Sequence, residues 1–109
     1  MNEDNAIAAF SALSNATRLK LLRLLVEAGP TGVTAGDLAE AIGASPSRAS
    51  FHLATLSEAG LATSERQARE IRYHVSFAAL GALMDFVLND CCKGDPLVRS
   101  CCGLPPPSA

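Results

Sequence analysis

The sequence lacks an apolar run long enough to cross a bilayer. Such a run needs about 18 residues, and the richest apolar stretch, residues 19–26, is interrupted by Lys20 and Arg23. The acidic first four residues are followed by no apolar core of the kind found in secretion signals. We therefore expect a cytoplasmic protein.

The net charge is small as well. The formal net charge at pH 7 is −2, and 18% of the residues are charged, which argues against a broad, non-specific affinity for nucleic acid. Any binding of DNA must then come from a local basic surface. Hydrophobic residues make up 49% of the 109 residues, which indicates one globular domain rather than a disordered or fibrous chain.

The residue patterns that catalysis requires are also missing. The sequence contains no nucleophile paired with a base, no glycine-rich phosphate loop and no convergent carboxylates. We therefore predict that the protein is not an enzyme and holds no permanent cofactor.

The N-terminal part predicts two helices. Residues 5–14 have helical spacing of apolar side chains, with a stripe made of Ile7, Phe10 and Leu13. Asn15 is a typical N-cap for a second helix, which runs to about Ala28 before Gly29-Pro30 ends it.

The next two predicted helices have the spacing of a helix-turn-helix. Thr34 caps a short helix that Gly43 ends. Ser45 is an N-cap with Pro46 at the first helical position, and this fourth helix runs to Gly60. About three residues separate the two helices, as in a helix-turn-helix.

After Gly60 the apolar period changes from helical to alternating. Residues 61–66 and 70–75 indicate the two strands of a β-hairpin around a polar tip at Gln67-Ala68. Helical spacing returns from Phe77 to about residue 90. This order predicts a mainly α fold with a β-hairpin, a winged helix-turn-helix.

We divide the chain at the cysteines. Residues 1–92 form the expected winged-helix domain for DNA binding and dimerisation, and residues 93–109 a cysteine-containing loop with a Pro-rich tail, frayed because the prolines at 105–107 cannot form a helix. A homodimer is expected because the amphipathic first and last helices carry more apolar surface than the core can cover.

The outward face of the fourth helix carries groups that suit DNA. At about 100° per residue, this face presents hydroxyls, a cation and an aromatic ring, with Ser50 and His52 on its flanks. The candidate DNA contacts on this helix are Ser47, Arg48, Ser50, Phe51, His52 and Thr55. Such side chains can hydrogen-bond base edges and phosphates or meet a thymine methyl group. An ordinary solvated face is the alternative.

Three arginines near the hairpin tip are candidate contacts to backbone phosphates. They are Arg66, Arg69 and Arg72. Glu65 and Glu70 dilute this charge, so a solvated hairpin stays an alternative.

Four stretches in combination resemble the ArsR/SmtB family of metal-sensing repressors. They read ALSNATRLKLL from residue 12, DLAEAIG from residue 37, SRASFHL from residue 47 and LSEAGL from residue 56. The resemblance, which spans about residues 8–75, implies a winged-helix dimer that binds an imperfect inverted repeat in double-stranded promoter DNA. It also implies that residues 47–52 lie on the recognition helix. Phe51 departs from the polar residue, often histidine, that is common there.

All four cysteines lie within twelve residues of one another, as the pairs Cys91-Cys92 and Cys101-Cys102. In a reducing compartment such thiols bind metals more often than they form disulfides, and soft thiolates favour soft ions. Trivalent arsenic and antimony form three bonds to sulfur, so one pair and a third thiol would hold arsenite or antimonite, whereas methylarsenite needs only two thiolates. Surface thiols without a ligand are the alternative.

The cysteine cluster resembles that of a subset of arsenic-responsive ArsR proteins, with the pattern Cys-Cys-x-Gly-x-Pro-x-x-Cys. The matching residues are Cys91, Cys92, Gly94 and Pro96. Arg99 stands where the third cysteine is usual, so the third ligand is open between Cys101 and Cys102. The site of the best-known arsenic sensors is absent, because residues 34–39 contain no thiol. Neither histidine, at positions 52 and 74, pairs with a carboxylate at helical spacing, and we expect both to be non-ligands.

The function predicted from the sequence is that of an arsenical-responsive repressor. A homodimer would bind operator DNA and dissociate when the C-terminal cysteines capture trivalent arsenic or antimony. One alternative is a repressor of the same fold that senses oxidation or cadmium. Another is a thiol redox protein or an arsenical carrier.

Overall fold

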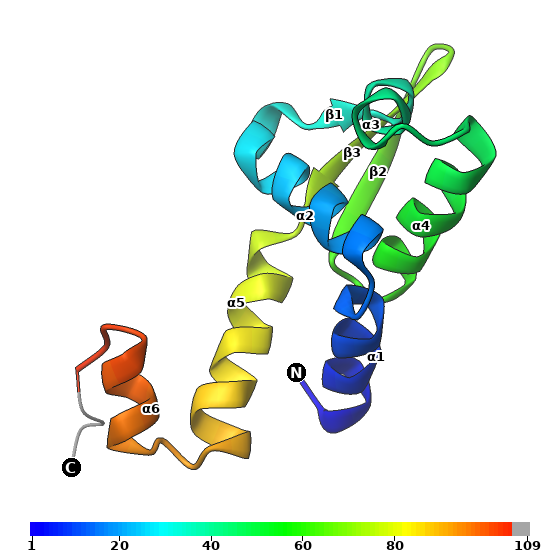
Figure 1. Cartoon of the computed structure of the whole chain (residues 1–109). Coiled ribbons are helices and arrows are strands. Elements are labelled where there is room, and N and C mark those ends of the chain that lie inside the picture. Colours follow the sequence, from blue (N-terminus) through cyan, green and yellow to red (C-terminus); the bar gives the residue numbers. More distant parts are fainter. Residues whose placement is uncertain (106–109) are drawn as a thin grey trace.

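The predicted helix-turn-helix and hairpin are both present in the computed structural model, which describes residues 1–105. The helices are α1 (Glu3–Leu13), α2 (Ala16–Ala28), α3 (Ala35–Ile42), α4 (Pro46–Glu58), α5 (Phe77–Asp85) and α6 (Pro96–Cys101), and the strands are β1 (Val33–Thr34), β2 (Ala62–Gln67) and β3 (Glu70–Val75). The molecule measures 53 × 24 × 22 Å, because α5 extends away from the other elements and α6 lies beyond it (Figure 1). None of the described helices is long and apolar enough to span a membrane.

Side-chain caps begin the helices of the DNA-binding motif where the sequence predicted them. Asn15 Oδ1 accepts a hydrogen bond from the Arg18 amide at 3.1 Å. Thr34 Oγ1 and Ser45 Oγ each accept one from the amide three residues later, both at 3.2 Å. Each cap satisfies an amide that the first helical turn leaves without a partner.

The sheet has one strand more than predicted. β2 and β3 form the expected antiparallel hairpin, and β1 pairs with the other edge of β3, with Val33 opposite Tyr73. Gly32 permits this approach. Its φ is +69°, and a Cβ there would lie 2.5 Å from the carbonyl oxygen of Tyr73. A strand of two residues is too short to give an alternating pattern, which is why the sequence did not predict it.

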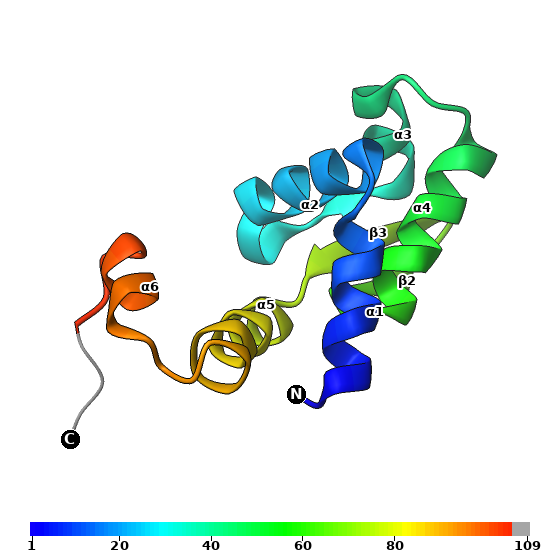
Figure 2. The same ribbon diagram turned by 60° about the horizontal axis from the view of Figure 1, so that its bottom comes forward.

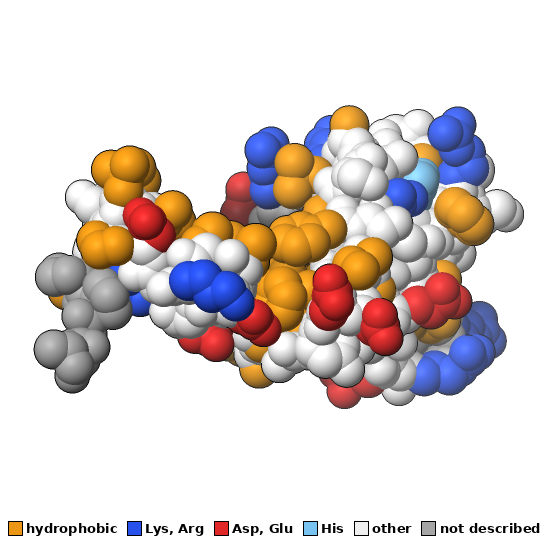
Figure 3. All heavy atoms as spheres, turned by 90° about the horizontal axis from the view of Figure 1, so that it is seen from below, with side chains coloured by type: hydrophobic (Ala, Val, Ile, Leu, Met, Phe, Trp, Pro, Cys, Tyr) orange, Lys and Arg blue, Asp and Glu red, His pale blue; other side chains and the backbone are white. Residues whose placement is uncertain are grey.

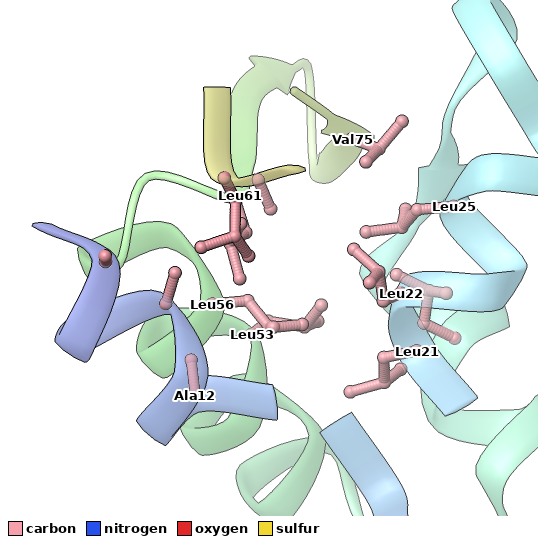
Figure 4. Packing of buried hydrophobic residues seen from close by; sticks show 13 residues of the cluster. Ala12, Leu21, Leu22, Leu25, Leu53, Leu56, Leu61 and Val75 are labelled. Carbon is pink, nitrogen blue, oxygen red and sulfur yellow. The ribbon is translucent and has the colours of Figure 1, made fainter. Parts of the chain in front are cut away.

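The core lies between α2, α4 and the base of the hairpin. Leucines from α2 and α4 point toward one another in Figure 4, and residues that begin and end the hairpin join them. The labelled members are Ala12, Leu21, Leu22, Leu25, Leu53, Leu56, Leu61 and Val75. This packing fixes α4 on the body so that its opposite side faces outward.

The first helix packs through its alanines. Its buried residues are Ala6, Ala9 and Ala12, which allow α1 to approach α2 and α4 closely. The predicted stripe divides: Ile7 is 58% exposed and Phe10 is 46% exposed, whereas Leu13 is half-buried against the core.

The last long helix continues beyond α5. The segment Phe86–Cys91, here called the π-helical turn, is wound as a π-helix, so the chain is helical as far as the first cysteine. A sequence pattern predicts this extent but not the wider winding.

The expected loop after the first cysteine pair was wrong for six residues, which form α6. Asp95 caps this helix by accepting from the Leu97 amide at 2.8 Å, and Pro96 occupies its first position. This is the same start signal as Ser45-Pro46. Most of the predicted frayed tail, residues 106–109, lies outside the described residues.

Candidate DNA interface and cysteine pairs

The outer face of α4 presents most of the predicted contacts to solvent. Four of them are exposed, namely Ser47, Arg48, Ser50 and Phe51. Phe51 is 66% exposed. Thr55 is half-buried, and its hydroxyl donates to the Phe51 carbonyl at 3.2 Å.

His52 differs from the expectation that it stands on the outward flank. Its side chain is buried, with 9% of the residue exposed, because the ring turns toward α2. Arg18 Nη1 lies 3.2 Å from His52 Nδ1. Burial lowers the pKa of His52, and the positive charges of Arg18 and Arg48 lower it further.

Arg18 links three elements that the sequence did not connect. Its Nε donates to the carbonyl oxygen of Ala12 at 2.6 Å, while its Nη1 reaches His52. One guanidinium at the start of α2 therefore joins the end of α1 to the middle of α4. Both contacts join segments far apart in the chain, so the sequence alone carries no signal for this role.

A hollow of about 330 Å³ lies on the outward side of α4. It is lined by Ser47, Arg48, Phe51 and His52. The hollow brings a hydroxyl, a guanidinium, an imidazole and the phenyl ring of Phe51 around one space, so it can receive a polar group of a partner molecule beside an apolar one.

The hairpin divides its three arginines between two roles. Arg66 and Arg69 are exposed near the tip, where Ala68 turns the chain with φ 55°. Arg72 was expected to join them, but its guanidinium is already bonded to the body of the protein. Its Nη1 donates to the carbonyls of Thr31 and Gly32 at 3.2 and 3.4 Å. Pairing of β1 with β3 brings those carbonyls within reach, so Arg72 ties the wing to the body.

The four cysteines lie on two separate helical ends. Cys91 closes the π-helical turn and Cys92 follows it, whereas Cys101 and Cys102 lie at the end of α6. All four are free thiols, and Cys92 alone is half-buried. Burial raises the pKa of the Cys92 thiol, and the neighbouring Cys91 thiol adds to the rise. Within residues 1–105, no three potential metal-ligating side chains come together.

Cys91 opens onto a groove of about 400 Å³ between α1 and the end of the π-helical turn. The lining residues include Glu3, Ile7, Phe10 and Phe86. Figure 1 and Figure 2 show α1 and α5 at the same end of the molecule, and Figure 3 shows hydrophobic side chains gathered on that face. The first cysteine pair is therefore next to the exposed apolar side of α1.

These elements define the class of the protein. A helix-turn-helix made by α3 and α4, followed directly by a two-stranded wing, is a winged helix-turn-helix domain, in which the second helix of the motif enters the major groove. A family model described as a helix-turn-helix domain matches residues 13–65. The chain belongs to the ArsR family of winged helix-turn-helix transcriptional regulators.

Two curated relatives cover most of the chain. The HTH-type transcriptional regulator YgaV of Escherichia coli is 35% identical over 89 residues, which are 82% of this chain and 88% of the relative. The transcriptional repressor SdpR of Bacillus subtilis is 36% identical over 86 residues, which are 79% of this chain and 92% of the relative.

Solved structures share the fold. An ArsR-like regulator from Rhodococcus has a TM-score of 0.71 with 28% identity, covering 89% of each chain. The homodimeric winged helix-turn-helix domain of Mb0332 from Mycobacterium bovis has a TM-score of 0.62 with 26% identity, covering 80% of this chain and 84% of that one. A possible transcriptional regulator for arsenical resistance has a TM-score of 0.65 with 31% identity, covering 85% and 92%.

Proposed function

We propose that this ArsR-family regulator is a homodimeric repressor that leaves its operator DNA when its C-terminal cysteines bind a trivalent arsenical. The observation that carries the proposal is the position of Cys91 and Cys92. They end the last long helical segment, and Cys91 lines a groove against α1. A ligand held there would act on the two elements that we assign to the dimer interface.

The dimer is proposed from exposed apolar side chains on α1 and α5. Ile7 and Phe10 are 58% and 46% exposed, and Phe77 and Met84 are 53% and 52% exposed. Monomeric proteins rarely expose such a patch without a partner surface. A second copy would cover it with the same patch in a two-fold arrangement, and the neighbour Mb0332 is described as homodimeric.

DNA contacts are assigned to the exposed face of α4 and to the wing tip. Ser47, Arg48 and Phe51 would meet the major groove, while Arg66 and Arg69 would contact backbone phosphates. Two copies would place the recognition helices in successive major grooves, about 34 Å apart. This arrangement suits an operator with an imperfect inverted repeat.

The ligand chemistry follows from the cysteines. Arsenite binds three thiols with loss of three waters, As(OH)3 + 3 RSH giving As(SR)3 + 3 H2O. Because the pairs lie on two helical ends, a third bond to Cys101 or Cys102 requires α6 to move toward Cys91 and Cys92. Methylarsenite needs two thiols only, which the adjacent pair supplies. The neighbour described as a possible regulator for arsenical resistance supports this ligand class.

The proposal is tested with reduced protein and labelled DNA. A duplex selected by the protein from a random pool serves as the probe, and fluorescence anisotropy follows its release. Arsenite, antimonite, methylarsenite, cadmium, zinc and peroxide are titrated separately. Release by the trivalent arsenicals supports the proposal. Release only by peroxide or cadmium, or turnover of a dithiol without specific DNA binding, would favour the alternative functions.

A further inference from the structure

The imidazole of His52 is held as one tautomer by its neighbour. Arg18 Nη1 lies 3.2 Å from His52 Nδ1, and a guanidinium donates hydrogen bonds but accepts none. Nδ1 must therefore accept, which places the proton of the neutral ring on Nε2. The lowered pKa of His52, caused first by burial and then by Arg18 and Arg48, favours that neutral form.

The donor at Nε2 remains open to an outside partner. Among fully buried side-chain polar atoms of the described residues, the one without a hydrogen-bond partner is Ser57 Oγ. Nε2 of His52 has no hydrogen-bond partner in the described part of the chain, yet it is not among these fully buried atoms. It is therefore reached by solvent. The ring also lines the hollow on α4 together with Ser47 and Arg48.

We propose that this hollow receives one phosphate of the DNA backbone, with His52 Nε2–H as a neutral hydrogen-bond donor and Arg18 as the residue that positions the ring. The inference rests on the DNA binding included in the proposed function. A phosphate suits the hollow because Arg48 lines it and the Arg18 guanidinium contacts the ring, so two positive charges lie close to the site. Contacts to phosphates fix the register of a protein on the duplex.

The position of the ring is set before DNA arrives. Arg18 is itself fixed by its bond to the Ala12 carbonyl at 2.6 Å, and His52 has 9% of its surface exposed. A donor that is already ordered loses less conformational entropy on binding than a long exposed side chain. His52 and Arg48 would then contribute differently, since Arg48 brings a charge to the DNA and the neutral imidazole does not.

Nitrogen-15 NMR of the imidazole tests the tautomer in the full chain. The sequence has two histidines, so the variant His74→Gln leaves His52 as the single imidazole signal. At neutral pH we expect a protonated Nε2 and an unprotonated Nδ1, and we expect Arg18→Met to remove this preference. A proton on Nδ1, or a tautomer that Arg18→Met does not change, would overturn the positioning role.

Binding of the selected duplex tests the contact. His52→Leu should lower affinity at least about tenfold, as expected when a hydrogen bond to a charged acceptor is removed. His52→Gln, which keeps an amide N–H near the position of Nε2, should lose less. The slope of log affinity against log salt should stay as in the wild type for both. Arg69→Ala, the charged control on the wing, should flatten it by about 0.9 for each phosphate that the protein no longer neutralises.

Single methylphosphonates in the duplex locate the phosphate. At one position in each half-site, the neutral substitution should weaken the wild type more than it weakens His52→Leu. Absence of such a position, unchanged affinity of His52→Leu, or a flattened salt slope in that variant overturns the contact. If the wild type selects no DNA sequence, the proposed function itself fails. Circular dichroism checks the fold of both variants. If His52→Leu does not fold, the affinity of His52→Gln and the NMR experiment test the contact in its place.

Discussion

Replacing Gly32 by alanine should loosen the wing from the body of the protein. Gly32 has φ +69°, and an added Cβ would lie 2.5 Å from the Tyr73 carbonyl oxygen and 2.6 Å from the His74 ring. With ψ −176° the backbone lies in a region that is essentially restricted to glycine, which costs a residue with a side chain about 1–3 kcal/mol. The contact with Tyr73 is to backbone, so it can be relieved only if β1 and β3 move apart. That movement would also strain the hydrogen bonds from Arg72 to the chain before β1.

We expect Gly32→Ala to lower the free energy of unfolding by at least about 2 kcal/mol, from the backbone strain together with the weakened strand pairing. This corresponds to a fall in Tm of roughly 8 °C or more. Gly36→Ala in α3 is the matched control, because an added Cβ meets nothing within 4 Å there. It should stabilise the helix by up to about 1 kcal/mol. Thermal and urea unfolding at one fixed protein concentration compare the two, and equal stabilities would refute the reasoning.

Three further predictions concern the dimer, the wing and pH. Ile7→Lys combined with Phe10→Lys should give a monomer by light scattering, since both side chains lie on the exposed side of α1; a persistent dimer would contradict the interface. Arg69→Ala should weaken DNA binding evenly across sequences and flatten its salt dependence, whereas Arg72→Ala should chiefly lower Tm, because its guanidinium bonds two backbone carbonyls. Equal salt slopes for Arg69→Ala and the wild type would remove the wing from the interface. The lowered pKa of His52 means that the unfolded chain binds this proton more readily, so its contribution to stability is complete above about pH 6.5 and is lost as the pH falls through the folded pKa. The free energy of unfolding, measured at several pH values over that range, should depend less on pH in His52→Gln than in the wild type. An unchanged pH dependence would count against a shielded imidazole.

The helices and the hairpin were predictable because their signals are local. Asn15, Thr34 and Ser45 cap helices through amides three residues later, and the alternation in residues 70–75 defines a strand without reference to the rest of the fold. Asp95-Pro96 is a local signal of the same kind and predicts the start of α6. The expectation of a loop over residues 93–109 did not use this signal and was therefore wrong for α6.

The features that sequence reasoning missed depend on contacts between distant segments. Arg18 and His52 are 34 positions apart, and Arg72 bonds carbonyls about 40 positions before it. Helical spacing placed His52 on a flank, but it could not show that Arg18 draws the ring inward. A strand of two residues such as β1 likewise forms only because β3 is already beside it.

Release of DNA by arsenite from the Cys91→Ser/Cys92→Ser variant, compared with the wild type, tests the central claim most directly. The variant should bind the selected duplex as tightly as the wild type. In the wild type, a 100-fold loss of DNA affinity would correspond to a coupling of about 2.7 kcal/mol between arsenical and DNA, and DNA would weaken arsenical binding by the same factor. Cys101→Ser is the matched control and should keep at least part of the response, because Cys102 lies beside it. Arsenite should leave the double variant on its DNA. Dissociation of that variant at the same arsenite concentration as the wild type would contradict it.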